Sequence, residues 1–180
     1  MHDATRAEWI AEALAQYEGP LLRFATKLLR DGDRARDVVQ ETFLQLCQQD
    51  RAAIEGHLAP WLFRVCRNRA FDLRRKESRV ETIAEVSPAA DPNPDPSQVV
   101  QQKQEGSHVL RILETLPEAH QEAVYLRFQS GLSYKEIAEI TGHSVTNVGF
   151  MLHAAVKKIR AHMDTMSRQL PHARVMEGSR

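Results

Sequence analysis

The stretch LSYKEIAEITGHSVTNVGFML, Leu132 to Leu152, predicts two short amphipathic helices with a break between them. Ser133 and Glu136 have the spacing of a capping box at the start of the first helix. Gly142 suits the left-handed conformation that ends a helix, and Ser144 can cap the second helix. Two short helices joined by a tight, glycine-containing turn form a helix-turn-helix, whose second helix can lie in a DNA major groove. An ordinary helical hairpin would show the same pattern, so this stretch alone leaves DNA binding open.

The composition of the 180 residues narrows the class of protein. Lys and Arg number 24, as do Asp and Glu, so no global field draws the chain to nucleic acid or membrane. No apolar run approaches the roughly 20 residues that span a bilayer, and the N-terminus lacks the basic-then-apolar order of a signal peptide. Cys47 and Cys66 form no CxxC pair, which suits a reducing compartment. We therefore expect a cytoplasmic protein without membrane insertion.

Sequence motifs for catalysis and for cofactors are missing. Cys and His residues do not cluster at the spacing of metal ligands. Nothing resembles a nucleophile elbow, a P-loop or a dinucleotide fingerprint. We therefore expect no enzymatic activity, no metal and no cofactor.

A proline-rich segment divides the chain into two parts. SPAADPNPDPSQ, Ser87 to Gln98, contains four of the eight prolines and almost no large apolar residue. Such a segment cannot form a packed core and is expected to be a solvated linker. Both flanking parts show helical periodicity, and strand-like alternation is missing. The prediction is an all-α protein with helical domains at 1–84 and 106–163, a linker at 85–105 and a disordered tail at 164–180.

The N-terminal part begins with an apolar stripe that Gly19-Pro20 is expected to interrupt or kink. A second helix follows, for which Asp33 is the predicted N-cap. Its apolar residues lie on one face, and acids and amides lie on the other. This polar face is either simply solvated or a docking surface for a basic partner. Its members are Asp37, Gln40, Glu41 and Gln45.

The third long helix, PWLFRVCRNRAFDLRRKESR (Pro60 to Arg79), is strongly basic. Seven basic residues stand against two acidic ones, a local net charge of about +5 in a neutral protein. Aromatic rings interleaved with basic and amide groups suit single-stranded nucleic acid, because bases stack on rings while guanidinium groups meet phosphates. The aromatic residues Trp61 and Phe71 could equally belong to the core. The candidate contacts are Trp61, Arg64, Arg67, Asn68, Phe71, Arg74, Arg75 and Lys76.

Three stretches together resemble an extracytoplasmic-function (ECF) sigma factor, the small two-domain class of bacterial sigma factor. ARDVVQETFLQL (35–46) is similar to the family helix that docks on the polymerase clamp. WLFRVCRNRAFDLRRK (61–76) resembles its promoter-melting helix, and residues 116–160 resemble its C-terminal helix-turn-helix domain. The stretches occur in the family's order, with the linker in the corresponding place, over nearly the whole chain.

The resemblance implies a factor that binds core RNA polymerase and directs promoter-specific transcription initiation. The C-terminal domain would read the upstream promoter element as duplex, and the N-terminal domain would capture the melted downstream element. Family knowledge places specificity for the downstream element at about 50–59 and around Asn68. An anti-sigma protein is a further expected partner. The duplex contacts expected are Lys135, Ser144, Thr146, Asn147, Phe150, His153 and Lys157.

Two alternatives remain at the level of sequence. A free-standing helix-turn-helix regulator would not depend on core polymerase and would leave the polar face at 37–45 without a purpose. A scaffold without a nucleic-acid role would leave the basic helix unexplained. The recognition helix also departs from many family members, because it carries Gly149-Phe150 where they have arginines. Phe150 has two interpretations, contact with a thymine methyl group or a place in the core.

Overall fold

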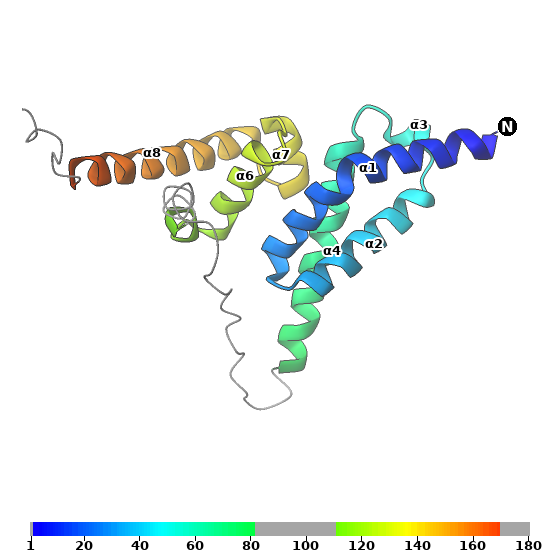
Figure 1. The fold of residues 1–180 in the computed structure, drawn as a ribbon, viewed down its shortest axis with the longest axis horizontal. Coiled ribbons are helices and arrows are strands. Elements are labelled where there is room, and N and C mark those ends of the chain that lie inside the picture. The colour runs from blue at the N-terminus through cyan, green and yellow to red at the C-terminus, as the bar shows by residue number, and fades with distance from the viewer. Residues whose placement is uncertain (1, 82–110, 170–180) are drawn as a thin grey trace, which may run out of the picture.

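The computed structural model describes residues 2–81 and 111–169 (Figure 1). Within these ranges the chain forms helices and no strands, which confirms the all-α prediction. The linker predicted at 85–105 lies outside the described residues, as do both domain boundaries that flank it. The helices are α1 (His2–Leu29), α2 (Gly32–Cys47), α3 (Arg51–Ile54), α4 (Leu58–Glu81), α6 (Glu118–Phe128), α7 (Tyr134–Thr141) and α8 (Val145–Gln169).

The long helices α1, α2 and α4 pack against one another and form the N-terminal half. Their shared core is apolar, and its largest members are fully buried: Leu21, Phe24, Leu46, Leu62 and Phe63. The rings of Phe24 and Phe63 meet edge to face at 5.4 Å between centroids, a favoured aromatic geometry. Burial of this face fixes the direction in which the remaining side of α4 points.

Two expectations about the N-terminal helices, an interruption at Gly19-Pro20 and an N-cap at Asp33, are wrong. Helix α1 runs without interruption through Gly19-Pro20. A proline removes one helical hydrogen bond, and the packing of α1 on α2 and α4 maintains the helix on both sides of it. The N-cap of α2 is Asp31 rather than Asp33: its carboxylate accepts hydrogen bonds from the backbone N–H groups of Asp33 and Arg34, at 2.9 and 3.1 Å.

The helix-turn-helix predicted around Gly142 is confirmed. The Ser133 hydroxyl accepts from the Glu136 N–H at 3.3 Å, and the Glu136 carboxylate accepts from the Ser133 N–H at 2.7 Å, so the capping box is complete. Gly142 ends α7 with φ 75°, a left-handed conformation that favours glycine. The Ser144 hydroxyl accepts from the Asn147 N–H at 3.1 Å and caps α8.

Helix α8 is longer than the sequence analysis expected. It continues to Gln169, whereas a disordered tail was predicted from 164 onward. At the start of this extension Asp164 and Thr165 are exposed, and no proline occurs between Val145 and Gln169 to end the helix. Residues 170–180 lie outside the described residues.

The two halves of the chain pack against each other. Helix α4 contacts α7, and the rings of Phe24 on α1 and Tyr125 on α6 stack with their centroids 5.7 Å apart. Figure 1 shows α7 beside the upper part of α4. This contact brings side chains of the second half onto the basic helix α4.

The two cysteines lie in different environments. Cys47 is exposed and Cys66 is buried, and neither forms a disulfide. Burial raises the pKa of the Cys66 thiol to about 12, and the nearby Thr42 hydroxyl opposes this shift. Cys66 is therefore a neutral core side chain at physiological pH. Among the described helices, none has the length and apolar character required to cross a membrane.

Candidate nucleic-acid and polymerase interfaces

One side of α4 carries three arginines and an aromatic ring. Arg64, Arg67, Phe71 and Arg74 follow one another at helical spacing and form what is here called the arginine face. The guanidinium carbons of Arg67 and Arg74 lie 4.6 and 5.7 Å from the centroid of the Phe71 ring. These are cation–π distances. The arrangement holds a ring and fixed positive charges close together, as stacking of bases and binding of phosphates require.

A shallow hollow adjoins the arginine face. Its lining consists of Arg67, Asn68, Phe71, Asp72 and Arg75. Asn68 is exposed there, and the Arg75 guanidinium is oriented by the Asp72 carboxylate at 2.8 Å. The exposed Lys76 follows next in the chain. An amide that can both donate and accept thus lies beside an aromatic ring and positive charge, a combination suited to an unstacked base.

Trp61 does not belong to this surface. Trp61, Leu62 and Phe63 are consecutive and all buried, with Trp61 only 8% exposed. Of the two interpretations of Trp61, burial supports the core and not a stacking platform. The sequence carried a signal for this, because three successive large apolar residues indicate that a helix is covered on more than one side.

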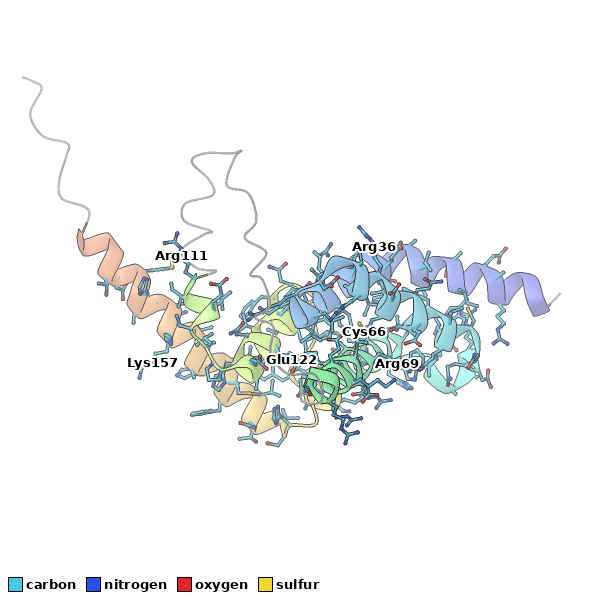
Figure 2. The ribbon with its side chains drawn as sticks, turned by 90° about the horizontal axis from the view of Figure 1, so that it is seen from below. Arg36, Cys66, Arg69, Arg111, Glu122 and Lys157 are labelled. Atoms are coloured by element: carbon cyan, nitrogen blue, oxygen red, sulfur yellow. The ribbon has the colours of Figure 1, made fainter. Side chains whose placement is uncertain are left out.

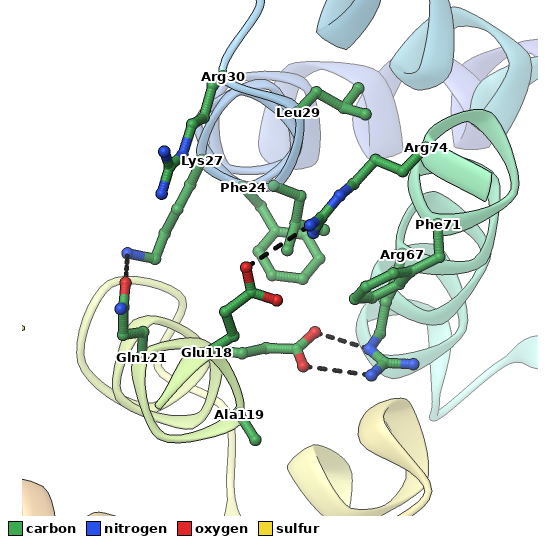
Figure 3. A pocket seen from close by; sticks show the side chains of 12 residues that line it. Phe24, Lys27, Leu29, Arg30, Arg67, Phe71, Arg74, Glu118, Ala119 and Gln121 are labelled. Atoms are coloured by element: carbon green, nitrogen blue, oxygen red, sulfur yellow. Dashed lines mark hydrogen bonds and ion pairs between the residues drawn. The ribbon is translucent and has the colours of Figure 1, made fainter. Parts of the chain in front are cut away.

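The arginine face is occupied by carboxylates from the second half of the chain. Glu122 on α6 accepts two hydrogen bonds from Arg67, at 2.6 Å from Nε and 3.2 Å from Nη2. Arg64 pairs with Glu139 at 3.3 Å, and Arg74 with Glu118 at 3.5 Å. Figure 3 shows Arg67, Arg74 and Glu118 converging on the cleft between α4 and α6. The sequence analysis identified the arginines but not these partners, and no spacing in the sequence links them.

Helix α2 presents the predicted docking residues in two environments. Asp37, Gln40 and Glu41 are exposed, and Gln45 is half-buried. The Glu41 carboxylate lies 3.5 Å from Arg69 of α4. With its amide oxygen toward Arg69, Gln45 accepts a hydrogen bond at 2.7 Å. Glu41 and Gln45 therefore also hold α2 and α4 together.

An apolar groove lies beside these polar residues, between α1 and α2. Its lining includes Leu14, Leu22, Val39, Phe43 and Leu44. Leu14 and Leu44 are 41% and 55% exposed, high values for large apolar side chains. The predicted docking residues thus border an apolar groove that the sequence analysis did not identify. Exposed leucines within an otherwise amphipathic pair of helices are the signal that could have indicated it.

The helix-turn-helix exposes all of its predicted contact residues. Helix α8 buries Val148, Met151, Leu152 and Ala155. Phe150 is 67% exposed, so the interpretation that places it in the core is wrong. Lys157 points outward from the middle of α8 (Figure 2). The exposed candidates are Lys135, Ser144, Thr146, Asn147, Phe150, His153 and Lys157.

Comparison with known proteins agrees with this geometry. Residues 13–80 match the family Sigma-70 region 2, and residues 108–159 match Sigma-70, region 4. The chain is 34% identical over 144 residues to the ECF RNA polymerase sigma factor EcfG of Rhodopseudomonas palustris, covering 79% of this chain and 78% of EcfG. It is 28% identical over 157 residues to the ECF RNA polymerase sigma factor SigE of Mycolicibacterium smegmatis, covering 84% of this chain and 60% of SigE.

A solved structure shares the fold. The sigma factor RpoE of Bartonella quintana, in complex with the anti-sigma factor NepR, matches with a TM-score of 0.61 and 24% identity, covering 86% of this chain and 96% of RpoE. The two family matches and the EcfG relationship together define the class: the chain belongs to the ECF family of RNA polymerase sigma factors.

The burial of Trp61 leads to a prediction about the stability of the fold. A change at Asn68, which is exposed on the same helix, serves as the control. Trp61→Ala is expected to lower the free energy of unfolding by about 3–5 kcal/mol, because it removes a large side chain from a packed core. Asn68→Ala, a change at an exposed position of the same helix, is expected to stay within about 0.5 kcal/mol of the parent. Urea unfolding followed by circular dichroism measures both. Equal stability of the two variants would contradict the burial of Trp61.

Proposed function

We propose that this chain binds core RNA polymerase and directs it to specific promoters. The observation that carries the proposal is that one chain presents two different surfaces of nucleic-acid-binding type. One is the exposed side of α8, and the other is the arginine face of α4 with its hollow. The protein acts without chemistry of its own, since nucleotide addition belongs to the polymerase. It works where the polymerase does, in the cytoplasm.

Helix α8 reads the upstream promoter element as duplex. Its first turns follow a capped, tight turn, which is the geometry that places the second helix of a helix-turn-helix in the major groove. Thr146, Asn147 and Phe150 are exposed in these turns. An amide can pair with adenine, and an aromatic ring can contact a thymine methyl group. Lys135 and Lys157 are placed to contact phosphates.

Helix α4 captures the downstream element as a melted single strand. Phe71 offers the ring on which a base stacks, in place of the buried Trp61. Asn68 offers an amide to the edge of an unstacked base, and Arg67, Arg74, Arg75 and Lys76 supply positive charge for the backbone. Stacking and charge of this kind hold single strands with little dependence on sequence, so selectivity rests on Asn68 and on residues 50–59.

Helix α2 docks on the polymerase. Asp37, Gln40 and Glu41 provide an exposed polar rim, and the groove containing Leu14 and Leu44 provides an apolar centre. An apolar centre with a polar rim is the usual anatomy of a protein interface. An anti-sigma protein is a further proposed partner. The Bartonella quintana relative is known in complex with one, NepR.

Transcription in vitro tests the proposed function directly. Core polymerase with and without the full chain is incubated with genomic promoter fragments, and transcripts are mapped. Promoter-specific transcripts that require the chain are the expected result. DNA binding without any dependence on core polymerase would instead support a free-standing regulator, and neither activity would support a scaffold.

The docking surface is tested by charge reversal. Asp37→Lys combined with Glu41→Lys is expected to weaken binding to core polymerase about tenfold or more, since like charges then face the basic partner. Affinity is measured by pull-down and titration with labelled core. Glu8→Lys combined with Glu12→Lys is the matched control, because both are exposed acids of α1. Unchanged binding of the α2 variant, with its helix content intact, would remove α2 from the docking surface.

Promoter choice is tested on α8. Thr146→Ala and Asn147→Ala are each expected to reduce discrimination between the cognate and altered upstream elements by about 1–3 kcal/mol. Competitive transcription by the holoenzyme on paired templates measures this ratio. Thr165→Ala changes the same residue type at an exposed position further along α8 and is expected to leave the ratio unchanged. Equal ratios for all three variants would contradict base reading by this part of α8.

A further inference from the structure

We infer that the carboxylates of α6 and α7 form a surface that binds the arginine face within the same chain and competes there with single-stranded DNA. The closed chain therefore masks its own melting helix, and the two halves must separate before a single strand can bind. The inference rests on the proposed function of α4 in capturing a single strand. Its partner is internal, an acidic surface that presents oxygens to guanidinium groups as a nucleic-acid backbone would.

The central contact is the pair between Arg67 and Glu122. The Glu122 side chain is 7% exposed and that of Arg67 is 20% exposed. Their two parallel hydrogen bonds, at 2.6 and 3.2 Å, have the bidentate geometry that arginine also forms with phosphate. Arg67 therefore cannot bind a phosphate while Glu122 occupies it. If Glu122 left Arg67 while both stayed buried, each charge would be unpaired and out of water, which is costly. Release of Arg67 therefore requires α6 to move away from α4, so that water can reach both side chains.

Two further carboxylates extend the acidic surface along the helix. Glu139 of α7 lies 3.3 Å from Arg64, and Glu118 of α6 lies 3.5 Å from Arg74. Each arginine of the arginine face thus has one carboxylate opposite it. Figure 3 shows Glu118 reaching toward Arg74 across the cleft, with the Phe71 ring and Arg67 beside it. The match is one of charge and spacing along more than two turns of α4.

The contact between the halves is of a kind that can open. The contact combines apolar packing, in which buried side chains of both halves join one cluster and the rings of Phe24 and Tyr125 stack, with a set of polar contacts across the cleft. They include the three ion pairs and a hydrogen bond of 3.4 Å from Lys27 to Gln121. Interfaces between the domains of one chain commonly allow relative motion unless they are large and hydrophobic. Exposed ion pairs also contribute little net stability, so a ligand that binds the open form can shift the equilibrium.

The acidic surface covers only part of the proposed single-strand site. Asn68, Arg75 and Lys76 remain exposed in the closed chain, whereas Arg67 and Phe71 line the cleft that α6 covers. The closed chain is therefore expected to retain weak contact with a single strand and to lack base stacking on Phe71. Opening adds the arginine face to contacts that are already available.

The first test measures binding of the free, full-length chain to a fluorescein-labelled, single-stranded 20-mer of mixed sequence. Glu118→Gln with Glu122→Gln removes two masking charges, and Glu8→Gln with Glu12→Gln removes two exposed acids of α1. Both variants change the net charge equally. If the open form makes up about 10% or less of the parent, unmasking tightens binding about tenfold relative to the control. Equal affinity of the two variants would overturn the masking.

The second test reads the conformation without DNA. Spin labels are placed at positions 30 and 114 in a variant that also carries Cys47→Ser. The charges of Arg30 and Glu114 both affect the pKa of Lys27, so these two residues lie near the cleft. Glu122→Arg is expected to replace a short, narrow distance distribution by a longer, broad one. Arg67→Glu combined with Glu122→Arg restores the opposite charges and is expected to restore the short distance.

The two readouts separate failure of the inference from failure of the proposed function. Unchanged distances in Glu122→Arg would show that the halves do not close through this pair, which overturns the inference whatever the transcription assay gives. If the halves open but single-strand binding does not tighten, the acidic surface does not compete with single-stranded DNA. The arginine face would then have no part in binding the strand. A short distance restored by the charge swap, together with tighter binding after unmasking, supports the inference.

Discussion

Burial of one side of α4 is the constraint on which the rest of the structure depends. Leu62, Cys66 and Ala70 lie one turn apart and are fully buried, where α4 packs on α1 and α2. Close packing in such a core leaves no freedom to rotate the helix about its axis. The arginine face must therefore point to the opposite side, toward the second half of the chain. The same packing places Arg69 beside Glu41 and Gln45 of α2.

A consequence is that one helix links the three proposed surfaces of the N-terminal half. Its apolar side holds α2 in place, so Asp37 and Gln40, the proposed docking residues, have a fixed orientation. Its arginine face contacts the acidic surface of α6 and α7, and we propose that a single strand competes for the same face. Large movements of α4 would disturb the core, so the element free to respond to a ligand is the second half of the chain as a unit.

Local signals predicted the helix-turn-helix well. The capping box of Ser133 and Glu136, the left-handed Gly142 and the cap at Ser144 act over at most four residues, and their geometry is independent of the rest of the fold. Local signals misled the prediction of the N-cap of α2, because two aspartates that can cap a helix stand two positions apart. Asp31 and Asp33 are both plausible caps, and only the observed start of α2 at Gly32 selects Asp31.

Burial of aromatic residues could not be decided from periodicity. Trp61, Phe71 and Phe150 each had a surface and a core interpretation. Trp61 is in the core, Phe71 lies between two arginines, and Phe150 is 67% exposed. A single helix pattern shows which residues share a side, but it does not show how much of that side a neighbouring helix covers. Coverage depends on the crossing of whole elements and on their lengths.

The sequence by itself determined the helical class, the two-part organisation, the helix-turn-helix and the concentration of positive charge on one helix. These follow from composition and from contacts between residues at most four apart along a helix. Only the tertiary structure decided what the arginine face contacts, because Arg67 and Glu122 are 55 positions apart. Such pairs are set by how two packed halves meet. Local chemistry does not determine which carboxylate pairs with which arginine. It also does not determine that both side chains of such a pair are buried.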